Sequence, residues 1–352
     1  MRVLLHCPFV LAENTGITRY LIGLLHALAT HTSGLEIRCL IPPGWDNLPP
    51  PLIPVPLTIH SGGGAGHPLS RLLRETAFLR RLHKTAPFDL FHSPFGYLPF
   101  SVPTPSLLTV PDMRILRWPR SFSPLRAAFL RWAMPRSLRN ATRVLPMSEF
   151  TKREILALVP GVPATKLTVA YPGLDTFWSL PATSDERSAL RKRIAEPFVL
   201  AVGTSEPHKN LEALIAAMKY HPEKKLALVG KTFASGRKKR LILPSNALSL
   251  GHLTDTELRA AYAEASVYCF PSLYEGFGYP PLEALAQGCP VVAADIPVLR
   301  EVLGQSATFA DPHAPAALAA ALTTARYQPP PSYTWQAHAQ IVLATYRAIL
   351  GT

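Results

Sequence analysis

The sequence has few cysteines and no cluster of metal-binding side chains. Its 352 residues include four cysteines, which are widely spaced in apolar, strand-like stretches: Cys7, Cys39, Cys269 and Cys289. The absence of a Cys-x-x-Cys pair argues against a disulfide framework or a zinc site of ordinary spacing. No Asp-x-Asp pair is present, so we expect no essential metal and no cofactor. We expect four buried, free thiols in a reducing compartment.

Long apolar runs are also absent. No stretch approaches the roughly 20 apolar residues that cross a bilayer. Residues 1–14 lack the length and the small-residue cleavage site of a signal peptide. We therefore expect a cytoplasmic protein, either free or held peripherally on the inner face of the membrane.

Acidic residues are missing from one basic stretch. None lies between Asp112 and Glu149, where eight arginines, at 114–143, alternate with apolar and aromatic side chains. Residues 1–180 carry 19 Lys and Arg against 9 Asp and Glu, a net charge of +10; residues 181–352 carry 17 against 14, a net charge of +3. Stretch 114–143 fits an anionic membrane surface, and a solvated basic face on a sheet fits equally well.

A basic protein can also bind nucleic acid. The basic run at residues 236–240 is compatible with that class, but an exposed helix end explains it better. No helix-turn-helix and no aromatic-rich single-strand motif is present. We therefore expect no specific nucleic-acid partner.

What the sequence does contain is an alternation of short apolar strands with helices, the first helix capped by Asn14 or Thr15. This pattern predicts parallel sheets covered on both faces. The expected strands are residues 2–8, 36–42, 88–94, 106–112, 143–148, 197–203, 225–230, 247–252, 266–272, 289–295 and 306–310.

A polar segment at 179–195, which we expect to be extended, separates two halves of this alternation. We predict two doubly wound α/β domains, at 1–180 and 181–334, and a final helix at 335–352. The proline-rich residues 42–56 are expected to form a loop or an edge segment. Because ligands bind at the carboxyl ends of such strands, we expect the ligand between the two domains.

A stretch rich in glycine follows the strand at 266–272. Glu275 and Glu283 have seven residues between them, and Gly276-Phe277-Gly278 follows the first. Glycines let backbone N–H groups approach a ligand, and the helix N-terminus behind them favours phosphate. Glu283, placed in the first helical turn, can accept hydrogen bonds from a ribose, and Glu275 can hold the hydroxyls of a second group. Phosphate between two polyols describes a nucleotide sugar.

These residues resemble the donor-site motif of the GT4 family of retaining glycosyltransferases, which have the GT-B fold of two Rossmann-like domains facing a cleft. The resemblance extends to residues 201–218, to 250–272 and to the final helix, which in the family crosses back to the N-terminal domain. It implies that a hexose passes from a nucleoside diphosphate sugar, GDP- or UDP-linked, to a saccharide or lipid-linked saccharide. Cell-surface polysaccharide or lipopolysaccharide assembly is the implied setting, and residues 203–210 favour mannose.

The resemblance implies roles for individual residues. Lys209 would bind the donor diphosphate, Glu275 would lie beside the sugar, and Asp112 would complete the catalytic set. A further set would bind the donor: Gly16, Gly203, Thr204, His208, Gly276, Phe277, Gly278 and Glu283. His92 and Ser148 are weaker candidates for an acceptor or sugar contact.

Two positions depart from the family pattern. Pro111 stands where the family has a histidine that touches the donor sugar, and His208 stands in a loop that often carries arginine. These departures keep two alternatives open: a non-catalytic protein that binds sugar nucleotides, and a GT-B enzyme of another reaction such as epimerisation.

Overall fold

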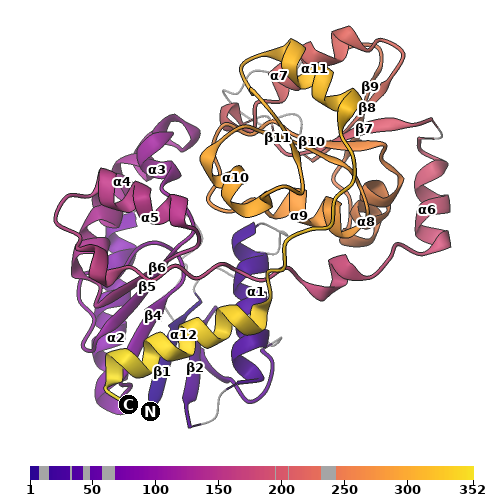
Figure 1. Cartoon of the computed structure of the whole chain (residues 1–352). Coiled ribbons are helices and arrows are strands. Elements are labelled where there is room, and N and C mark those ends of the chain that lie inside the picture. Colours follow the sequence, from indigo (N-terminus) through magenta and orange to yellow (C-terminus); the bar gives the residue numbers. More distant parts are fainter. Residues whose placement is uncertain are drawn as a thin grey trace. The chain divides into compact units, whose positions relative to one another are not determined.

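The computed structural model describes residues 1–7, 16–31, 34–42, 48–57, 68–194, 196–204, 206–230 and 243–352. Asn14, Thr15 and the basic run 236–240 lie outside these residues. The chain divides into two compact units (Figure 1). Unit 1 contains Met1–Gly173 and Tyr333–Thr352, and unit 2 contains Leu174–Ser332.

Unit 1 is built around a six-stranded sheet in the order β3-β2-β1-β4-β5-β6, with every neighbouring pair parallel. Its strands are β1 (Arg2–His6), β2 (Glu36–Ile41), β3 (Ile53–Pro56), β4 (Leu90–Ser93), β5 (Ser106–Val110) and β6 (Arg143–Pro146). The proline-rich segment supplies β3 at the sheet edge, where a residue without an N–H leaves no buried acceptor unpaired.

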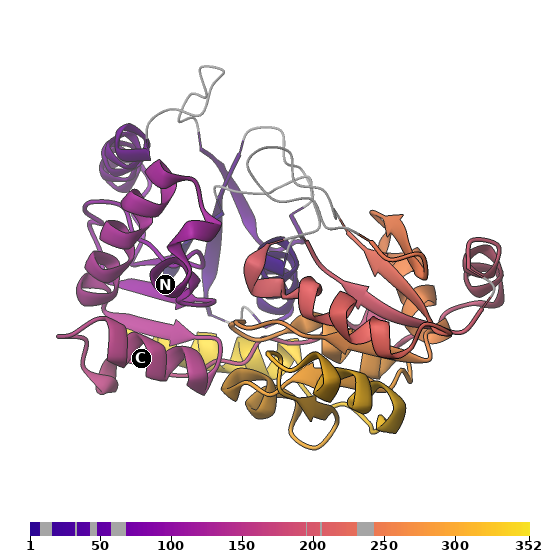
Figure 2. The same ribbon diagram turned by 90° about the horizontal axis from the view of Figure 1, so that it is seen from above.

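Helices of unit 1 connect these strands and lie against the sheet (Figure 2). They are α1 (Gly16–Ala29), α2 (Pro68–Thr85), α3 (Arg114–Arg117), η1 (Pro119–Ser121), α4 (Pro124–Asn140), α5 (Glu149–Leu158), η2 (Ala164–Lys166) and α12 (Trp335–Leu350). No helix within the described ranges is long and apolar enough to cross a membrane.

Unit 2 repeats the same topology. Its sheet order is β12-β11-β10-β7-β8-β9, again parallel throughout. Its strands are β7 (Phe198–Val202), β8 (Lys225–Val229), β9 (Ala247–Gly251), β10 (Val267–Phe270), β11 (Val291–Ala294) and β12 (Thr308–Ala310). The prediction of two doubly wound α/β halves is confirmed.

The helices of unit 2 alternate with its strands. They are η3 (Thr176–Ser179), α6 (Ser184–Arg191), η4 (Pro207–Lys209), α7 (Leu211–Ala217), η5 (Met218–Tyr220), α8 (Asp255–Glu264), α9 (Tyr279–Ala286), α10 (Pro297–Leu303) and α11 (Pro315–Thr324).

One prediction about the segment at 179–195 is wrong. It is not extended, because α6 begins there at Ser184. Thr183 caps this helix: its hydroxyl accepts a hydrogen bond from the Glu186 N–H, and the Glu186 carboxylate accepts one from the Thr183 N–H. This reciprocal capping box satisfies backbone donors that a helix start otherwise leaves unpaired.

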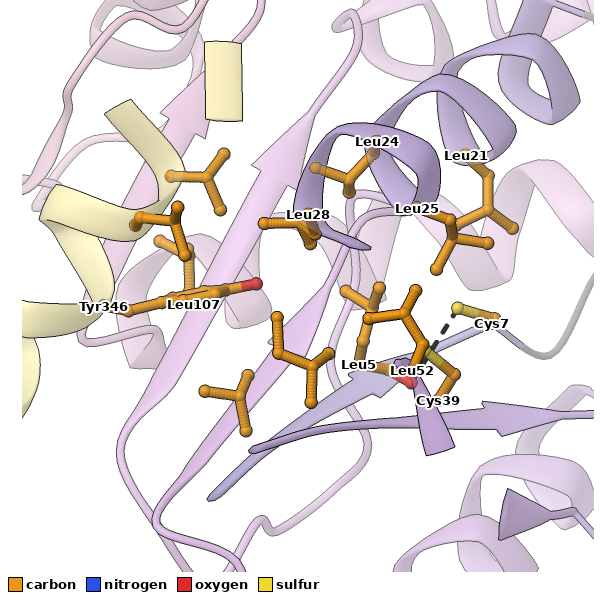
Figure 3. Close-up of a cluster of buried hydrophobic side chains, with 14 of the residues drawn as sticks. Leu5, Cys7, Leu21, Leu24, Leu25, Leu28, Cys39, Leu52, Leu107 and Tyr346 are labelled. Carbon is orange, nitrogen blue, oxygen red and sulfur yellow. Dashed lines mark hydrogen bonds between the residues drawn. The ribbon is translucent and has the colours of Figure 1, made fainter. Parts of the chain in front are cut away.

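The core of unit 1 depends on α12, which lies beside α1 and the strands of unit 1 (Figure 1). Figure 3 shows a row of α1 leucines and Tyr346 of α12 around the sheet residues, namely Leu21, Leu24, Leu25 and Leu28 with Leu5, Cys7, Cys39 and Leu107. All four cysteines are buried and free, as expected. Burial raises the pKa of the Cys269 and Cys289 thiols to about 12, so neither is a thiolate near neutral pH.

Two buried histidines attach α12 to the rest of unit 1. His92 of β4 contacts the Tyr346 hydroxyl with Nδ1 at 2.7 Å and the Thr109 hydroxyl with Nε2 at 2.9 Å. His338 of α12 contacts the Tyr20 hydroxyl with Nε2 at 3.1 Å and the Tyr171 carbonyl with Nδ1 at 3.0 Å. Hydrogen bonds to all four ring nitrogens make these polar side chains tolerable inside an apolar core.

We expect unit 1 to lose stability in mild acid because these histidines resist protonation. Burial, and then the neighbouring His338, lowers the pKa of His92 from 6.5 to about 3; burial lowers the pKa of His338 to about 4. Below pH 6.5 the unfolded chain therefore binds protons that the folded chain does not. The free energy of unfolding should fall by about 2 kcal/mol for each histidine between neutral pH and pH 5.

Urea unfolding of the whole chain at pH 7.5, 6.5, 5.5 and 5.0 measures this dependence. His338→Gln should have a shallower pH dependence than the wild type, whereas the exposed His313→Gln should keep the wild-type slope. Equal slopes for all three proteins would contradict the assignment.

Candidate functional site

The candidate site lies where the strand order of unit 2 reverses. β7 and β10 are neighbours in the sheet, but their connections run to opposite sides, towards β8 and β11. A crevice opens at the carboxyl ends of two such strands, and ligands of doubly wound sheets bind there. The loop after β7 carries Lys209 and the loop after β10 carries Glu275.

Lys209 and Glu275 form an ion pair at this point. The Lys209 ammonium donates to Glu275 Oε1 at 2.7 Å, and the two side chains are 21% and 15% exposed. The ammonium also lies 5.4 Å from the centre of the Phe270 ring, near enough for a cation–π contribution. The structure therefore brings together two of the three residues predicted to be catalytic.

Backbone and amide hydrogen bonds hold the two loops in register. The Leu273 N–H donates to the His208 carbonyl at 2.7 Å. Asn210 adopts the left-handed conformation, with φ of 53°, and its amide donates to the Pro271 carbonyl at 3.1 Å and to the Pro312 carbonyl at 2.8 Å. Sequence reasoning missed Asn210, although asparagine before an apolar helical run is a turn signal.

Gly203, Thr204 and His208 lie in the same loop as Lys209. The Gly203 N–H donates to the Val229 carbonyl at 2.9 Å and extends the β7–β8 pairing by one residue. The Thr204 hydroxyl donates to Glu206 Oε2 at 3.2 Å. His208 is buried, and its Nε2 lies 3.8 Å from the same carboxylate oxygen. Glu206 thus links two of the predicted donor-binding residues.

Gly276, Phe277 and Gly278 lead from Glu275 into α9. Gly278 has a φ of +98°, and a Cβ there would lie 3.0 Å from Leu299 Cδ2. The backbone angle favours glycine, and a Cβ would in addition press on the end of the Leu299 side chain. Phe277 is buried, with its ring 5.3 Å from that of Tyr279, so its side chain anchors the loop.

Glu283 lies deeper than predicted. α9 begins at Tyr279, so Glu283 is the fifth residue of the helix and belongs to the second turn, not to the first. Its side chain is 1% exposed, and Oε2 accepts a hydrogen bond from the Tyr262 hydroxyl at 3.1 Å.

The remaining candidates belong to unit 1. Gly16 is the exposed first residue of α1. Asp112 follows β5, and its Oδ1 accepts a hydrogen bond from the Arg114 N–H at 2.8 Å, which starts α3. Pro111 precedes it, and the Pro111 carbonyl accepts from the Thr151 hydroxyl at 3.4 Å.

The two weaker candidates for a sugar or acceptor contact, His92 and Ser148, both make hydrogen bonds within unit 1. His92 is fully buried, and Tyr346 and Thr109 occupy both of its ring nitrogens. Ser148 is also fully buried; its hydroxyl caps α5 by accepting from the Thr151 N–H at 3.0 Å. His92 lies in β4 one residue before its end, and Ser148 follows the end of β6 by two residues.

Within the described residues, no group of three or more His, Cys, Asp or Glu side chains is arranged to hold a metal ion. The charged groups that converge at the β7–β10 edge are a cation and a carboxylate, which suits a substrate with both phosphate and hydroxyl groups.

Two family profiles together match most of the chain. The profile described as Glycosyltransferase Family 4 matches residues 14–177, and the profile described as Glycosyl transferases group 1 matches residues 183–334. The chain belongs to glycosyltransferase family 4. Its two matched regions fall on the two sheets, and the second contains the Lys209–Glu275 pair and α9.

Curated relatives of this family 4 chain include two mannosyltransferases. It is 29% identical over 211 residues to the O-antigen chain mannosyltransferase RfbU of Salmonella typhimurium, covering 58% of this chain and 56% of the relative. It is 28% identical over 241 residues to the O-antigen chain mannosyltransferase B of Escherichia coli, covering 64% and 61%. The matched region thus spans less than two thirds of either relative's length.

The fold of the family 4 chain is shared with solved structures. The structure of Anabaena HepE in complex with UDP-glucose superposes with a TM-score of 0.70 at 17% identity, over 99% of this chain and 100% of that one. At this identity the likeness establishes the fold, which is the two-sheet GT-B architecture.

We expect Gly278→Ala to destabilise unit 2 by about 2–3 kcal/mol, because alanine would be strained at a φ of +98° and its methyl group would press on Leu299. Gly288→Ala is the matched control: its φ is +79°, but a Cβ there meets nothing within 4 Å, so only the backbone strain of about 1 kcal/mol applies. Urea unfolding measures both variants. An equal loss in the two would rule out a steric contribution from Leu299.

Proposed function

We propose that the chain is a retaining glycosyltransferase that moves a hexose from a nucleoside diphosphate sugar to a hydroxyl of a saccharide or lipid-linked saccharide. The observation that carries this proposal is the Lys209–Glu275 pair at the β7–β10 switch point, 2.7 Å across and partly exposed. A cation and a carboxylate at that edge suit the phosphate and the hydroxyls of such a donor.

Lys209 would stabilise the leaving group. Its ammonium has three N–H donors, and within the described residues Glu275 accepts one of them. The remaining donors suit the oxygens of a diphosphate, whose charge grows as the bond to the sugar breaks. In retaining transfer the acceptor attacks on the face that the diphosphate leaves, and a phosphate oxygen takes the acceptor's proton. The role of the protein is then positioning and electrostatic stabilisation.

The carboxylates would orient the polyols at either end of the diphosphate. Glu275 borders the glycine loop and would accept hydrogen bonds from the sugar hydroxyls. Glu283, on the buried face of α9, would accept from the ribose. The N–H groups of Gly276 and Gly278 would meet the phosphates between them. We propose no metal or cofactor in this step, and we assign Asp112 to the acceptor side of the reaction.

Mannose is the hexose we propose, because the two curated relatives described above are named as O-antigen chain mannosyltransferases. Their names also favour cell-surface polysaccharide assembly as the setting. The HepE structure was solved with UDP-glucose, so both GDP- and UDP-linked donors are to be tested.

Lys209→Met should weaken binding of the nucleoside diphosphate roughly 10- to 100-fold, which corresponds to the loss of one charged hydrogen bond. Titration calorimetry with GDP, UDP, GDP-mannose and UDP-glucose measures the affinity. Lys219→Met, at an exposed position on η5, is the matched control and should bind like the wild type. A Lys209 variant with unchanged affinity for every nucleotide would remove the basis of the proposed donor site.

Turnover separates the proposed enzyme from a binding protein. Release of nucleoside diphosphate in the presence of oligosaccharide and lipid-linked acceptors is expected, and NMR of the product should show the anomeric configuration of the donor. Tight donor binding without any transfer to these acceptors would favour the non-catalytic alternative.

We also propose that α4 of unit 1 rests on an anionic membrane surface on the cytoplasmic side. Four apolar side chains lie on this helix at the spacing of a single stripe, called here the α4 stripe: Leu125, Ala128, Phe129 and Trp132. Leu125 is 54% exposed and Trp132 is 45% exposed. Exposed arginines, Arg126 and Arg131, flank the stripe. An apolar stripe bordered by cations is the pattern of helices that lie in a membrane interface.

Other arginines of the 114–143 stretch serve the fold. Arg117 forms a two-pronged ion pair with Glu154, at 2.6 Å for each bond. Arg136 donates to the carbonyls of Pro99 and Phe100. The sequence left two roles open for this basic stretch, a membrane contact or a structural basic face. Arg117 and Arg136 have structural roles, whereas we assign the exposed Arg126 and Arg131, beside the α4 stripe, to the membrane contact.

Replacing Leu125 and Trp132 together by serine should reduce binding to anionic vesicles by at least 10-fold, because two of the most exposed apolar side chains are lost. Co-sedimentation with vesicles of phosphatidylglycerol and phosphatidylethanolamine measures it, beside vesicles of phosphatidylcholine alone. Replacing Tyr220 and Tyr327, exposed aromatics of unit 2, is the matched control. Equal binding of wild type and the stripe variant would exclude the stripe as a membrane contact.

A further inference from the structure

We propose that Tyr262 is a positioning residue for the donor: its hydroxyl fixes the carboxylate of Glu283 in the orientation that receives the ribose. This inference rests on the proposed function, because it assigns Tyr262 a task only if Glu283 contacts a nucleotide. Tyr262 lies on α8, and sequence reasoning did not select it.

The contact is a buried one. Tyr262 is fully buried, Glu283 is 1% exposed, and the phenol oxygen lies 3.1 Å from Oε2 of the carboxylate. A carboxylate at this depth needs hydrogen-bond donors from the protein, since water reaches it poorly. A donor with one fixed direction also decides which way the two carboxylate oxygens point.

Aromatic neighbours hold the Tyr262 ring in place. The Trp178 ring meets it edge to face at 5.9 Å, and the Tyr268 ring does so at 5.3 Å. These neighbours come from η3 and β10, so the phenol is held from two different elements. Arg259, one turn earlier on α8, pairs with Glu186 of α6 at 2.6 Å. The helix that presents the phenol is therefore itself attached to its surroundings.

Tyr268 provides a contrast within the same aromatic cluster. Its hydroxyl is fully buried and has no hydrogen-bond partner among the described residues. Burial first, and then the negative charge of nearby Glu283, raise the pKa of this phenol. Two buried phenols thus lie near Glu283, and only that of Tyr262 is bonded to it. Removing each hydroxyl in turn separates the bond from the general effect of losing a buried phenol.

The test is Tyr262→Phe, with Tyr268→Phe as the matched control. Both changes keep the aromatic ring. The probes are GDP and UDP, each beside its 2′-deoxy and 3′-deoxy forms, with affinities measured by titration calorimetry. We consider the nucleoside diphosphate that the wild type binds. Tyr262→Phe should weaken the affinity for this ribonucleotide about 10-fold. For the deoxy form that lacks the hydroxyl in contact with Glu283, the same variant should weaken the affinity less than 3-fold. Tyr268→Phe should leave both within 2-fold.

A double-mutant cycle identifies the route of the effect. In a Glu283→Gln background, Tyr262→Phe should have less than a 3-fold effect, since the carboxylate that it orients is gone. In turnover, Tyr262→Phe should raise KM for the donor and leave kcat within about 2-fold.

Failure of the Tyr262 inference can be distinguished from failure of the proposed donor site. If Tyr262→Phe weakens ribose and deoxy forms equally, or retains its full effect without Glu283, Tyr262 is merely structural and the inference is overturned. If Glu283→Gln leaves all affinities unchanged, or the wild type binds neither nucleotide, the proposed donor role fails, and the inference fails with it.

Discussion

Parallel pairing of every described strand is the constraint on which the positions of the candidate residues depend. A parallel sheet needs a crossover between successive strands, so its faces are covered and its carboxyl ends share one edge. In unit 2 the order reverses between β7 and β10, and the loops after these strands carry a lysine and a glutamate that meet at 2.7 Å. The sheet of unit 1 has the same strand order, so its loops also gather at one edge of the sheet.

Interior polar groups follow from this arrangement. Side chains that point into the covered layers of the sheet are removed from water, and each polar one must find a hydrogen-bond partner there. His92 does so through Tyr346 and Thr109, and Glu283 does so through Tyr262. In the first case the partners occupy both ring nitrogens and the residue supports the fold. In the second, the bonded carboxylate lies next to the glycine loop of the candidate site.

Much of the fold was predictable because the hydrophobic pattern is local. Apolar stretches predicted the strands, and the sequence also predicted the first and last helices, α1 and α12. The capping signal of α6 was also present, as Thr183 with Glu186 three residues later, but the polar composition of that segment concealed it. The Lys209–Glu275 pair could be anticipated from the family resemblance, although not the direct contact between the two side chains.

The remaining features of the site depend on how deeply individual side chains are buried, which the sequence does not specify. The sequence does not distinguish His92, which is buried against Tyr346 of α12, from a histidine near a strand end that is exposed to a ligand. Nor does the spacing from Glu275 reveal that Glu283 falls in the second turn of α9 with its side chain buried. Tyr262 is separated from Glu283 by 20 intervening residues, and only the packing of α8 beside α9 makes them neighbours.

The return of α12 to unit 1 has a consequence for how the chain is made. Unit 1 is discontinuous in sequence: residues 333–352 complete a core begun by residues 1–173, and residues 174–332 lie between them. A ribosome therefore delivers all of unit 2 before it delivers Tyr346 and His338. Until α12 is synthesised, the apolar surface that it buries on α1 and β1 stays exposed. Unit 2 can therefore complete its core before unit 1 does.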